Sequence, residues 1–219
     1  MDSSQARFNM VEQQVRPWEV LDQGVLDAML ALPREHFVPE AYRKLAYSDI
    51  RIPLGHGQAM FAPKWEGRLI QALAPTGSER VLEIGTGSGY LTALLASLAS
   101  EVVSLDIIGE FTLAASRRLR ALAIENVTCL EADGLNLASL PQCAPFDLIA
   151  VTASSPARLT TLEAQLAPGG RLFAVVGSGR VMEALLVSRE AEDTFSTESL
   201  FELELEPLRG AETPPTFRF

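Results

Sequence analysis

Three acidic residues and one glycine-rich turn have the types and spacing of a ligand-binding site. In the segment EIGTGSGY, Glu83 stands two residues before the first glycine of a GxGxG pattern, at the end of a short apolar run. Asp106 in SLDI and Asp133 in EADG each come at the end of another such run. Glycines at a turn let the chain bend tightly and let a ligand lie against bare backbone. The pattern therefore predicts a pocket in which three carboxylates lie beside exposed backbone.

Each acid is expected to recognise a different part of the ligand. Glu83 would repel a pyrophosphate but attract a cationic amino group, and Asp106 could accept hydrogen bonds from both hydroxyl groups of a ribose. Asp133 could accept one from the amino group of an adenine, with Gly134 keeping its turn narrow. An adenosine joined to a positively charged end is therefore predicted, and S-adenosylmethionine fits that description. Taken singly, each acid could equally be a helix-capping carboxylate.

The glycine spacing argues against two commoner nucleotide sites. GxGxG differs from the GxGxxG fingerprint of dinucleotide-binding proteins, and it lacks the Lys-Ser/Thr of a phosphate-binding loop. A nicotinamide oxidoreductase therefore fits the pattern poorly, and a tight turn without a ligand is the structural alternative. The residues expected to contact the cofactor are His56, Gly57, Glu83, Gly85, Thr86, Gly87, Ser88, Gly89, Asp106, Ile107, Asp133, Gly134 and Thr152.

Composition and charge argue against other classes of partner. The 219 residues carry a formal net charge of -10, and 47% of them are hydrophobic. So acidic a chain repels a phosphate backbone unless basic residues cluster, and only scattered basic pairs occur, such as Arg43-Lys44. No apolar run approaches the ~20 residues of a membrane span. We therefore expect a cytoplasmic protein, monomeric or homodimeric, with neither a nucleic acid nor a membrane as partner.

The cysteines and histidines do not suggest a metal site. Cys129 and Cys143 form no CxxC pair, and His36 and His56 lie far apart in sequence without the spacing of metal ligands. Two isolated thiols are typical of a reducing compartment. Structural roles are expected for both cysteines.

From Glu79 onward, short strands alternate with helices. Apolar runs predict strands at residues 80–85, 101–107, 126–133, 146–154 and 169–177, with helices at 88–99, 109–123 and 159–167. This alternation predicts right-handed crossovers and a parallel sheet with helices on both faces. Two more strands, at 184–190 and 196–208, are close enough in sequence to form an antiparallel pair at one edge. The fold class is therefore α/β, with a doubly wound, mostly parallel seven-stranded sheet.

The first 78 residues have a different pattern. Helical periodicity covers Gln5 to Leu32, and Pro17 is expected to divide it because proline lacks a backbone donor and favours the start of a helix. A short strand is expected within residues 48–57, entering a glycine-containing loop, followed by a helix at 64–74. We therefore expect an N-terminal helical and substrate-loop appendage at 1–78 and a cofactor-binding core at 79–219, packed as one compact unit.

Longer motifs run from near the N-terminus to Gly177. They are PREHFVP, IPLGHGQAMFAP, VLEIGTGSGYLTALLA, EADG, PFDLIAVTAS and QLAPGGRLFAVVG. With these motifs the sequence resembles the class I S-adenosylmethionine-dependent methyltransferases, and more narrowly the protein-L-isoaspartate O-methyltransferase family. The resemblance implies a Rossmann-like fold, S-adenosyl-L-methionine as methyl donor and S-adenosyl-L-homocysteine as product. It also implies protein repair, in which the α-carboxylate of an L-isoaspartyl residue in a damaged protein or peptide is methylated.

The loop after Gly55 departs from the pattern of that family. Where the resemblance implies Gly-Gln-Thr-Ile-Ser, with the serine in the active site, this sequence reads Gly-Gln-Ala-Met-Phe, so Phe61 takes the serine position. A carboxylate, with a pKa of about 4, is ionised at neutral pH and can attack an activated methyl group without a base. Alignment alone can supply about 7–11 kcal/mol of the barrier. Gln58 and Phe61 are therefore the candidate catalytic residues, expected to hold and shape the acceptor end of the site.

Three hypotheses follow for the acceptor. The first is repair methylation of isoaspartyl residues. The second is methylation of a different acceptor, such as a small molecule, because Phe61 reshapes the pocket and removes a hydrogen bond that can be worth about 1.5–3 kcal/mol. The third is a protein that binds S-adenosylmethionine without catalysing methyl transfer.

Overall fold

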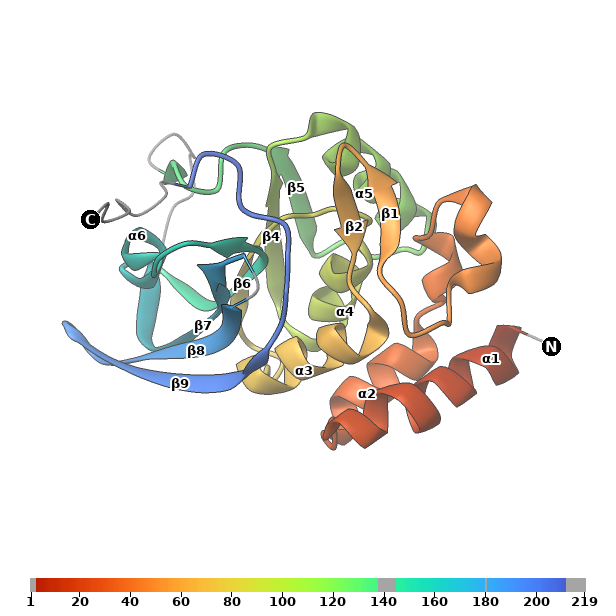
Figure 1. Ribbon diagram of the computed structural model, residues 1–219, viewed down its shortest axis with the longest axis horizontal. Helices are drawn as coiled ribbons and strands as arrows, with labels where there is room; N and C mark the ends of the chain where they lie inside the picture. Colours follow the sequence, from red (N-terminus) through yellow and green to blue (C-terminus); the bar gives the residue numbers. More distant parts are fainter. Residues whose placement is uncertain (1–2, 138–144, 180, 212–219) are drawn as a thin grey trace.

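The fold is built around a seven-stranded sheet (Figure 1). The computed structural model describes residues 3–137, 145–179 and 181–211, so Cys143 lies outside the described residues. The strands lie in the order β5-β4-β3-β6-β7-β8-β9, and their bounds are β3 (Arg80–Ile84), β4 (Glu101–Asp106), β5 (Val127–Glu131), β6 (Phe146–Ser155), β7 (Leu166–Ser178), β8 (Val181–Ala191) and β9 (Thr194–Glu202). Strands β3 to β7 are parallel, and β8 and β9 continue the sheet as antiparallel strands. The predicted α/β class is confirmed.

The order of the strands shows where the winding of the chain reverses. From β3 the chain moves outward to β4 and β5, and it then returns to place β6 on the other side of β3. Helices α4 (Tyr90–Leu98) and α5 (Gly109–Ala121) form the first two crossovers. In sheets wound in this way, ligands bind beyond the carboxyl ends of the strands at the reversal. The glycine turn after β3 and Asp106 at the end of β4 both lie there.

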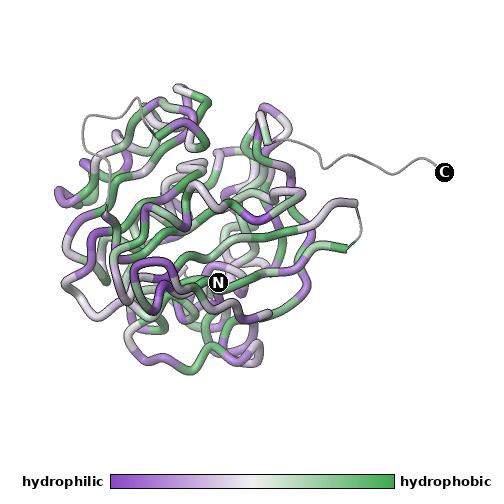
Figure 2. Tube along the Cα trace, turned by 90° about the vertical axis from the view of Figure 1, so that its left-hand side faces the viewer, coloured by the Kyte–Doolittle hydropathy of each residue, from purple (hydrophilic) through white to green (hydrophobic). Residues whose placement is uncertain are grey.

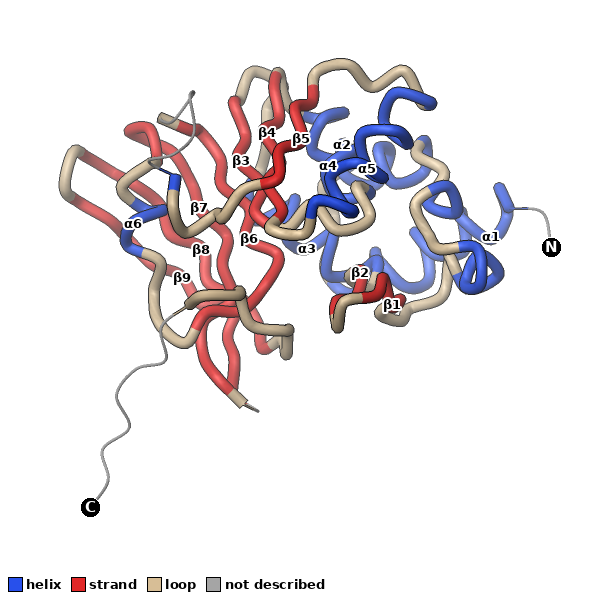
Figure 3. Tube along the Cα trace, turned by 90° about the horizontal axis from the view of Figure 1, so that it is seen from above, coloured by secondary structure: helices blue, strands red, loops and turns tan. Residues whose placement is uncertain are grey.

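Helices cover the two faces of the sheet unevenly (Figure 3). One face packs against α4, α5 and α3 (Pro63–Leu73) in a hydrophobic cluster that draws on residues before and after residue 78. The other face is covered, among the described residues, by the four-residue α6 (Thr160–Glu163) and by connecting segments. Successive side chains of a strand point to opposite faces of the sheet, so Val102 belongs to the first cluster and Val103 to the second. Apolar stretches of the chain therefore run through the middle of the molecule (Figure 2).

The N-terminal region begins with a broken helix. Its elements are α1 (Ser3–Met10), a π-helical turn (Val11–Val15), a 3-10 turn (Arg16–Trp18), α2 (Gln23–Ala31) and two more 3-10 turns (Arg34–His36 and Glu40–Leu45). The break falls around Pro17, as the sequence predicts, because proline cannot donate the backbone hydrogen bond that a continuing helix needs. Asp22 caps α2 by accepting a hydrogen bond from the Val25 N–H (3.0 Å).

A hairpin follows this helical region. The strand expected within residues 48–57 is one arm of it, β1 (Ile52–Gly55), and β2 (Gln58–Met60) is the other. Figure 1 shows the hairpin standing apart from the sheet, in front of α4 and α5. Helix α3 then begins at Pro63, which suits a first helical position because its missing N–H would have no partner there.

The end of the described chain also differs from the expected pattern. The last strand was expected at 196–208, but β9 stops at Glu202 and the chain turns away from the sheet edge. Residues 203–211, called the C-terminal segment below, run back to β6. There the Ser154 N–H donates to the Glu206 carbonyl (2.9 Å), and the Leu208 N–H donates to the Ser154 carbonyl (2.7 Å). The C-terminal segment is thereby fixed at the carboxyl ends of the strands.

Candidate active site

A cavity that is open to solvent lies at the carboxyl ends of β3 to β6. The strand ends form one part of its wall, and the hairpin, α3 and the C-terminal segment form the rest. The predicted site residues that line it are Gln58, Phe61, Gly85, Thr86, Gly87, Ser88, Asp106, Ile107, Asp133, Gly134 and Thr152.

The glycine turn presents its backbone to the cavity. Gly85 has φ 101°, and Thr152 from β6 packs so closely that a Cβ at Gly85 would overlap its hydroxyl oxygen. That hydroxyl donates to the carbonyls of Ile84 and Gly85, both at 3.0 Å. The Gly85 and Thr86 N–H groups donate to the Leu105 carbonyl at 2.7 and 3.2 Å. The turn is therefore held from two neighbouring strands, and only glycine fits at its first position.

Asp106 stands at the end of β4 with its carboxylate on the cavity wall. One carboxylate oxygen accepts the Gly87 N–H and the other accepts the Ile108 N–H, each at 2.9 Å. Each oxygen keeps a second lone pair, so the carboxylate could also accept both hydroxyl groups of a ribose. Burial raises the pKa of Asp106 above its usual value although both backbone N–H groups lower it. Its contact with a ribose stays a prediction from the sequence.

Asp133 and Gly134 follow β5 and complete the strand-end wall. Asp133 is exposed and accepts a hydrogen bond from the Leu135 N–H (2.9 Å). A Cβ at Gly134 would come within 2.5 Å of the Ile84 side chain, so this turn is as narrow as expected. Ile107, whose side chain is half exposed, adds an apolar surface next to Asp106. The wall thus offers two carboxylates and an apolar face.

Glu83 lies behind the glycine turn, which differs from its expected contact with the cofactor. It is 0% exposed and is not among the described residues that line the cavity. Its carboxylate accepts hydrogen bonds from the hydroxyls of Thr92 (2.5 Å) and Ser104 (2.6 Å), and Ser104 in turn meets the Thr86 hydroxyl (2.6 Å). Burial raises the pKa of Glu83 to about 8. The strand alternation directs this side chain toward α4, so Glu83 supports the turn from below.

The Gly-His-Gly segment forms the tip of the hairpin. His56 (φ 54°) and Gly57 (φ 74°) have the two positive φ angles of a type I′ turn. The His56 imidazole lies 3.0 Å from a Glu110 carboxylate oxygen and packs edge-on against the Phe111 ring. His56, Gly57 and Gly89 are not among the described residues that line the cavity. They shape turns beside the site, and their expected cofactor contacts stay predictions.

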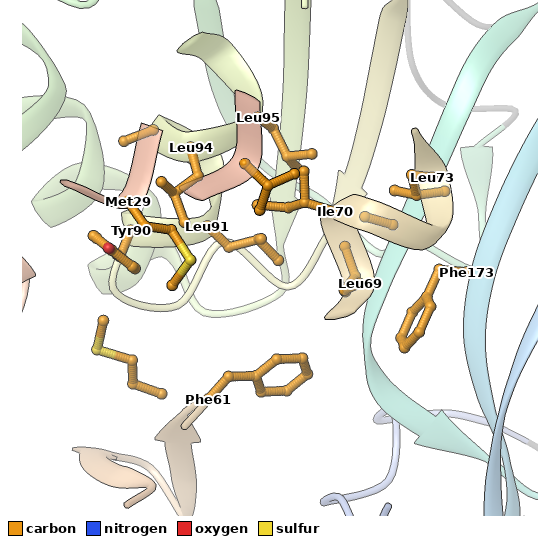
Figure 4. Close-up of a cluster of buried hydrophobic side chains, with 14 of the residues drawn as sticks. Met29, Phe61, Leu69, Ile70, Leu73, Tyr90, Leu91, Leu94, Leu95 and Phe173 are labelled. Atoms are coloured by element: carbon orange, nitrogen blue, oxygen red, sulfur yellow. The ribbon is translucent and has the colours of Figure 1, made fainter. Parts of the chain in front are cut away.

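The loop between β2 and α3 forms the acceptor end. Gln58 is half-buried, and Phe61 is buried, with its ring directed toward the apolar side chains of α3 (Figure 4). Arg34 donates through Nη2 to the Phe61 carbonyl (2.5 Å) and forms an ion pair with Glu66, which also lines the cavity. The side chain at the serine position is thus part of the hydrophobic core as well as of the cavity wall.

The C-terminal segment closes the cavity from a direction that the sequence did not indicate. Glu206, Pro207, Leu208 and Arg209 line it. Glu206 forms an ion pair with Arg51, and Arg209 donates through Nη2 to the His56 carbonyl (3.0 Å). The segment is therefore joined to the hairpin across the opening of the cavity.

Two parts of the site were missed from the sequence, and each left a signal. The buried positions of α3 are otherwise apolar or small, so a glutamate among them, Glu66, indicates a buried partner. In the C-terminal segment, Pro207 argues against a strand that continues to 208. No group of three or more potential metal-ligating side chains occurs among the described residues.

Comparison with known sequences gives matches over nearly the whole chain. The family model described as Protein-L-isoaspartate(D-aspartate) O-methyltransferase matches residues 6–212. Protein-L-isoaspartate O-methyltransferase 1 of Rhodopseudomonas palustris (strain HaA2) is 42% identical over 207 residues, covering 94% of this chain and 84% of that protein. Protein-L-isoaspartate O-methyltransferase 2 of Marinobacter nauticus is 41% identical over 215 residues, covering 98% of this chain and 97% of that protein.

The fold has similar solved structures. A Plasmodium falciparum chain assigned to this family and crystallised with S-adenosyl-L-homocysteine aligns with a TM-score of 0.78 and 20% identity, covering 95% of this chain and 99% of that chain. The likeness extends through the hairpin and the N-terminal helices as well as the sheet, because it covers nearly all of both chains. From the family match and the identity to its relatives, we conclude that the chain belongs to the protein-L-isoaspartate(D-aspartate) O-methyltransferase family.

Proposed function

We propose that this protein uses S-adenosylmethionine to methylate the α-carboxylate of L-isoaspartyl residues in damaged proteins or peptides. The observation that carries the proposal is one cavity that joins the glycine turn and two strand-end acids to the loop of Gln58 and Phe61. Relatives that are 42% and 41% identical carry the name of this activity. They favour the repair reaction over a different acceptor or a protein without catalysis.

The strand-end wall fits S-adenosylmethionine. Asp106 would hold the ribose through the lone pairs that its backbone hydrogen bonds leave open, and Asp133 and Ile107 would flank the adenine. The backbone from Gly85 to Ser88 would lie against the amino-acid end, where a Cβ on Gly85 would collide with Thr152. When bound, the cofactor supplies a methyl group that is activated by its sulfonium charge.

The acceptor end suits a reaction that needs orientation more than proton transfer. An acceptor carboxylate is already ionised at neutral pH, and the described lining residues include no histidine, cysteine or lysine. The Gln58 side chain carries an amide N–H that can donate to this carboxylate, the role that Phe61 cannot fill. Met60, Phe61 and Leu54 would exclude water around it. Such alignment can supply about 7–11 kcal/mol of the barrier.

A pair of matched peptides tests the proposal. The protein is incubated with methyl-labelled S-adenosylmethionine and a peptide that contains either L-isoaspartate or L-aspartate at one position. We expect base-labile methyl ester on the isoaspartyl peptide only, because only that isomer presents a free α-carboxylate at the damaged residue. Calorimetry with S-adenosyl-L-homocysteine measures the cofactor site separately. Binding of S-adenosyl-L-homocysteine without labelling of the isoaspartyl peptide would disprove the proposed acceptor but not the proposed cofactor site.

The expectations about location, oligomeric state and other partners rest on the sequence. No helix within the described residues has the length and apolar character needed to cross a bilayer. A cytoplasmic location, a monomeric or homodimeric state and the lack of a nucleic-acid partner stay predictions from the sequence.

A further inference from the structure

A buried ion pair holds the acceptor loop from behind. Arg34 and Glu66 are 0% and 1% exposed, and their side chains are paired. While Nη1 of Arg34 donates to Glu66, Nη2 donates to the Phe61 carbonyl at 2.5 Å. The same guanidinium lies over the Tyr90 ring, with Cζ 4.6 Å from the ring centroid. One arginine therefore contacts the loop, helix α3 and the first residue of α4.

The Phe61 carbonyl needs such a donor. Phe61 is 6% exposed and lies between Met60, where the hairpin register ends, and Pro63, where α3 begins. Neither the hairpin nor the helix therefore offers this carbonyl a regular partner, and a buried carbonyl without a donor is costly. Ala62 at the N-cap makes no side-chain hydrogen bond that could fix the loop. The position of the loop thus depends on Arg34.

Glu66 connects this contact to the acceptor. Glu66 lines the same cavity as Phe61. Burial raises the pKa of Glu66 to about 7, while the facing Arg34 guanidinium acts in the opposite direction. A lone carboxylate beside this cavity would repel an anionic acceptor, and the guanidinium balances its charge. The pair therefore positions the loop, and it also keeps the acceptor end of the cavity free of an unbalanced negative charge.

We propose that Arg34 is a positioning residue for the acceptor: Glu66 anchors its Nη1 arm, its Nη2 arm holds the Phe61 carbonyl, and this contact sets where Gln58 and Phe61 lie in the cavity. This inference rests on the proposed function, because it assumes that the loop meets the acceptor. Lysine cannot replace the arginine, since an ammonium is a point charge and lacks the planar fork of a guanidinium.

Arg34→Lys separates this role from simple charge balance, because it keeps the positive charge beside Glu66 and loses the second arm. We expect kcat/KM for the isoaspartyl peptide to fall about tenfold or more, since small misplacements of reacting groups are costly. The affinity for S-adenosyl-L-homocysteine should stay unchanged. Wild-type acceptor kinetics in folded Arg34→Lys would overturn the inference.

The matched control is Arg158→Lys. Arg158 also makes a two-armed contact with a buried glutamate, Glu163, at 2.9 and 2.7 Å, and it is not among the described residues that line the cavity. This control should keep wild-type kinetics for both substrates. An equal loss in Arg158→Lys and Arg34→Lys would show a general effect on the fold, and the inference would fall.

Hydrogen exchange supplies a readout that does not depend on turnover. Arg34→Lys should speed exchange of the amides in residues 58–62 and leave the turn at 85–89 unchanged. Unchanged exchange in 58–62 would overturn the inference. If the wild type methylates no isoaspartyl peptide while this exchange pattern appears, the proposed acceptor fails and the loop contact stands. Should Arg34→Lys fail to fold, Glu66→Asp, which shortens the anchor and keeps its charge, is judged by the same exchange criterion.

Discussion

Asp106 is the residue at which a single change should separate cofactor binding from folding. Its carboxylate accepts two backbone N–H groups and lines the cavity. Asp106→Asn removes the charge and one pair of acceptor sites, so we expect about 10- to 100-fold weaker binding of S-adenosyl-L-homocysteine, the loss typical of a hydrogen bond to a charged group. Calorimetry measures the affinity, and thermal unfolding checks the fold.

Asp147→Asn is the control for this change. Asp147 accepts a backbone N–H from Arg80 (2.8 Å) near the opposite ends of the strands and is not among the described residues lining the cavity. It should leave the affinity unchanged. If both variants lose affinity equally, Asp106 acts through the fold alone.

For single residues, the sequence predicts where a side chain stands along a strand better than the direction in which that side chain points. Asp106 and Asp133 were placed correctly on the cavity wall because both follow parallel strands, whose carboxyl ends meet at one edge. Glu83 also stands near a strand end, but one residue of alternation turns its side chain toward α4. The importance of Arg34 was not predicted, because its partner lies 32 residues away and only the fold brings them together.

The turn between β3 and α4 is the element on which the cofactor end depends. Gly85→Ala would place a Cβ against the Thr152 hydroxyl at a φ of 101°. We expect a lower free energy of unfolding and loss of S-adenosyl-L-homocysteine binding, because Thr152 and β6 must shift. Gly169→Ala also has a positive φ, 81°, but meets nothing within 4 Å. Gly169→Ala should lower the free energy of unfolding by only about 1–2 kcal/mol, which is the cost of the left-handed conformation. Urea unfolding and calorimetry compare the two, and equal effects would contradict the packing argument.

Elements that depend on local sequence were predicted well, and those fixed by distant contacts were not. The strands from β3 to β7 follow from apolar runs, and the break near Pro17 follows from proline itself. His56 and Gly57 are expected to contact the cofactor because glycine-rich binding loops and type I′ turns share a composition, and the structure places them in a hairpin turn. Residues 203–208 are expected to continue the last strand, but hydrogen bonds to Ser154, about 50 residues earlier in the chain, and to Met182 hold them instead.

For the whole molecule, one buried glutamate should link stability to pH. Burial raises the pKa of Glu83 to about 8, from an ordinary value of 4.5. The groups facing Glu83 are the Thr92 and Ser104 hydroxyls, with the charges of Asp106 and Glu66 raising its pKa further. Above about pH 5 the unfolded chain has lost this proton while the native protein retains it.

The native protein therefore binds more protons than the unfolded chain between about pH 5 and pH 8, and its free energy of unfolding should fall as the pH rises through this range. Glu83 contributes at most about 1.4 kcal/mol per pH unit. Thr92 and Ser104 donate to the same oxygen of Glu83, and Glu83→Gln keeps one oxygen for them. This variant should flatten the decrease in the free energy of unfolding, measured in urea, between about pH 6 and pH 8. Glu79→Gln is the control: hydrogen bonds from Thr76 and Gly77 lower the pKa of Glu79, so its contribution changes only below about pH 4.5. An equal slope in the wild type and Glu83→Gln would show that Glu83 is ionised throughout this range, with Thr92 and Ser104 donating to a buried carboxylate.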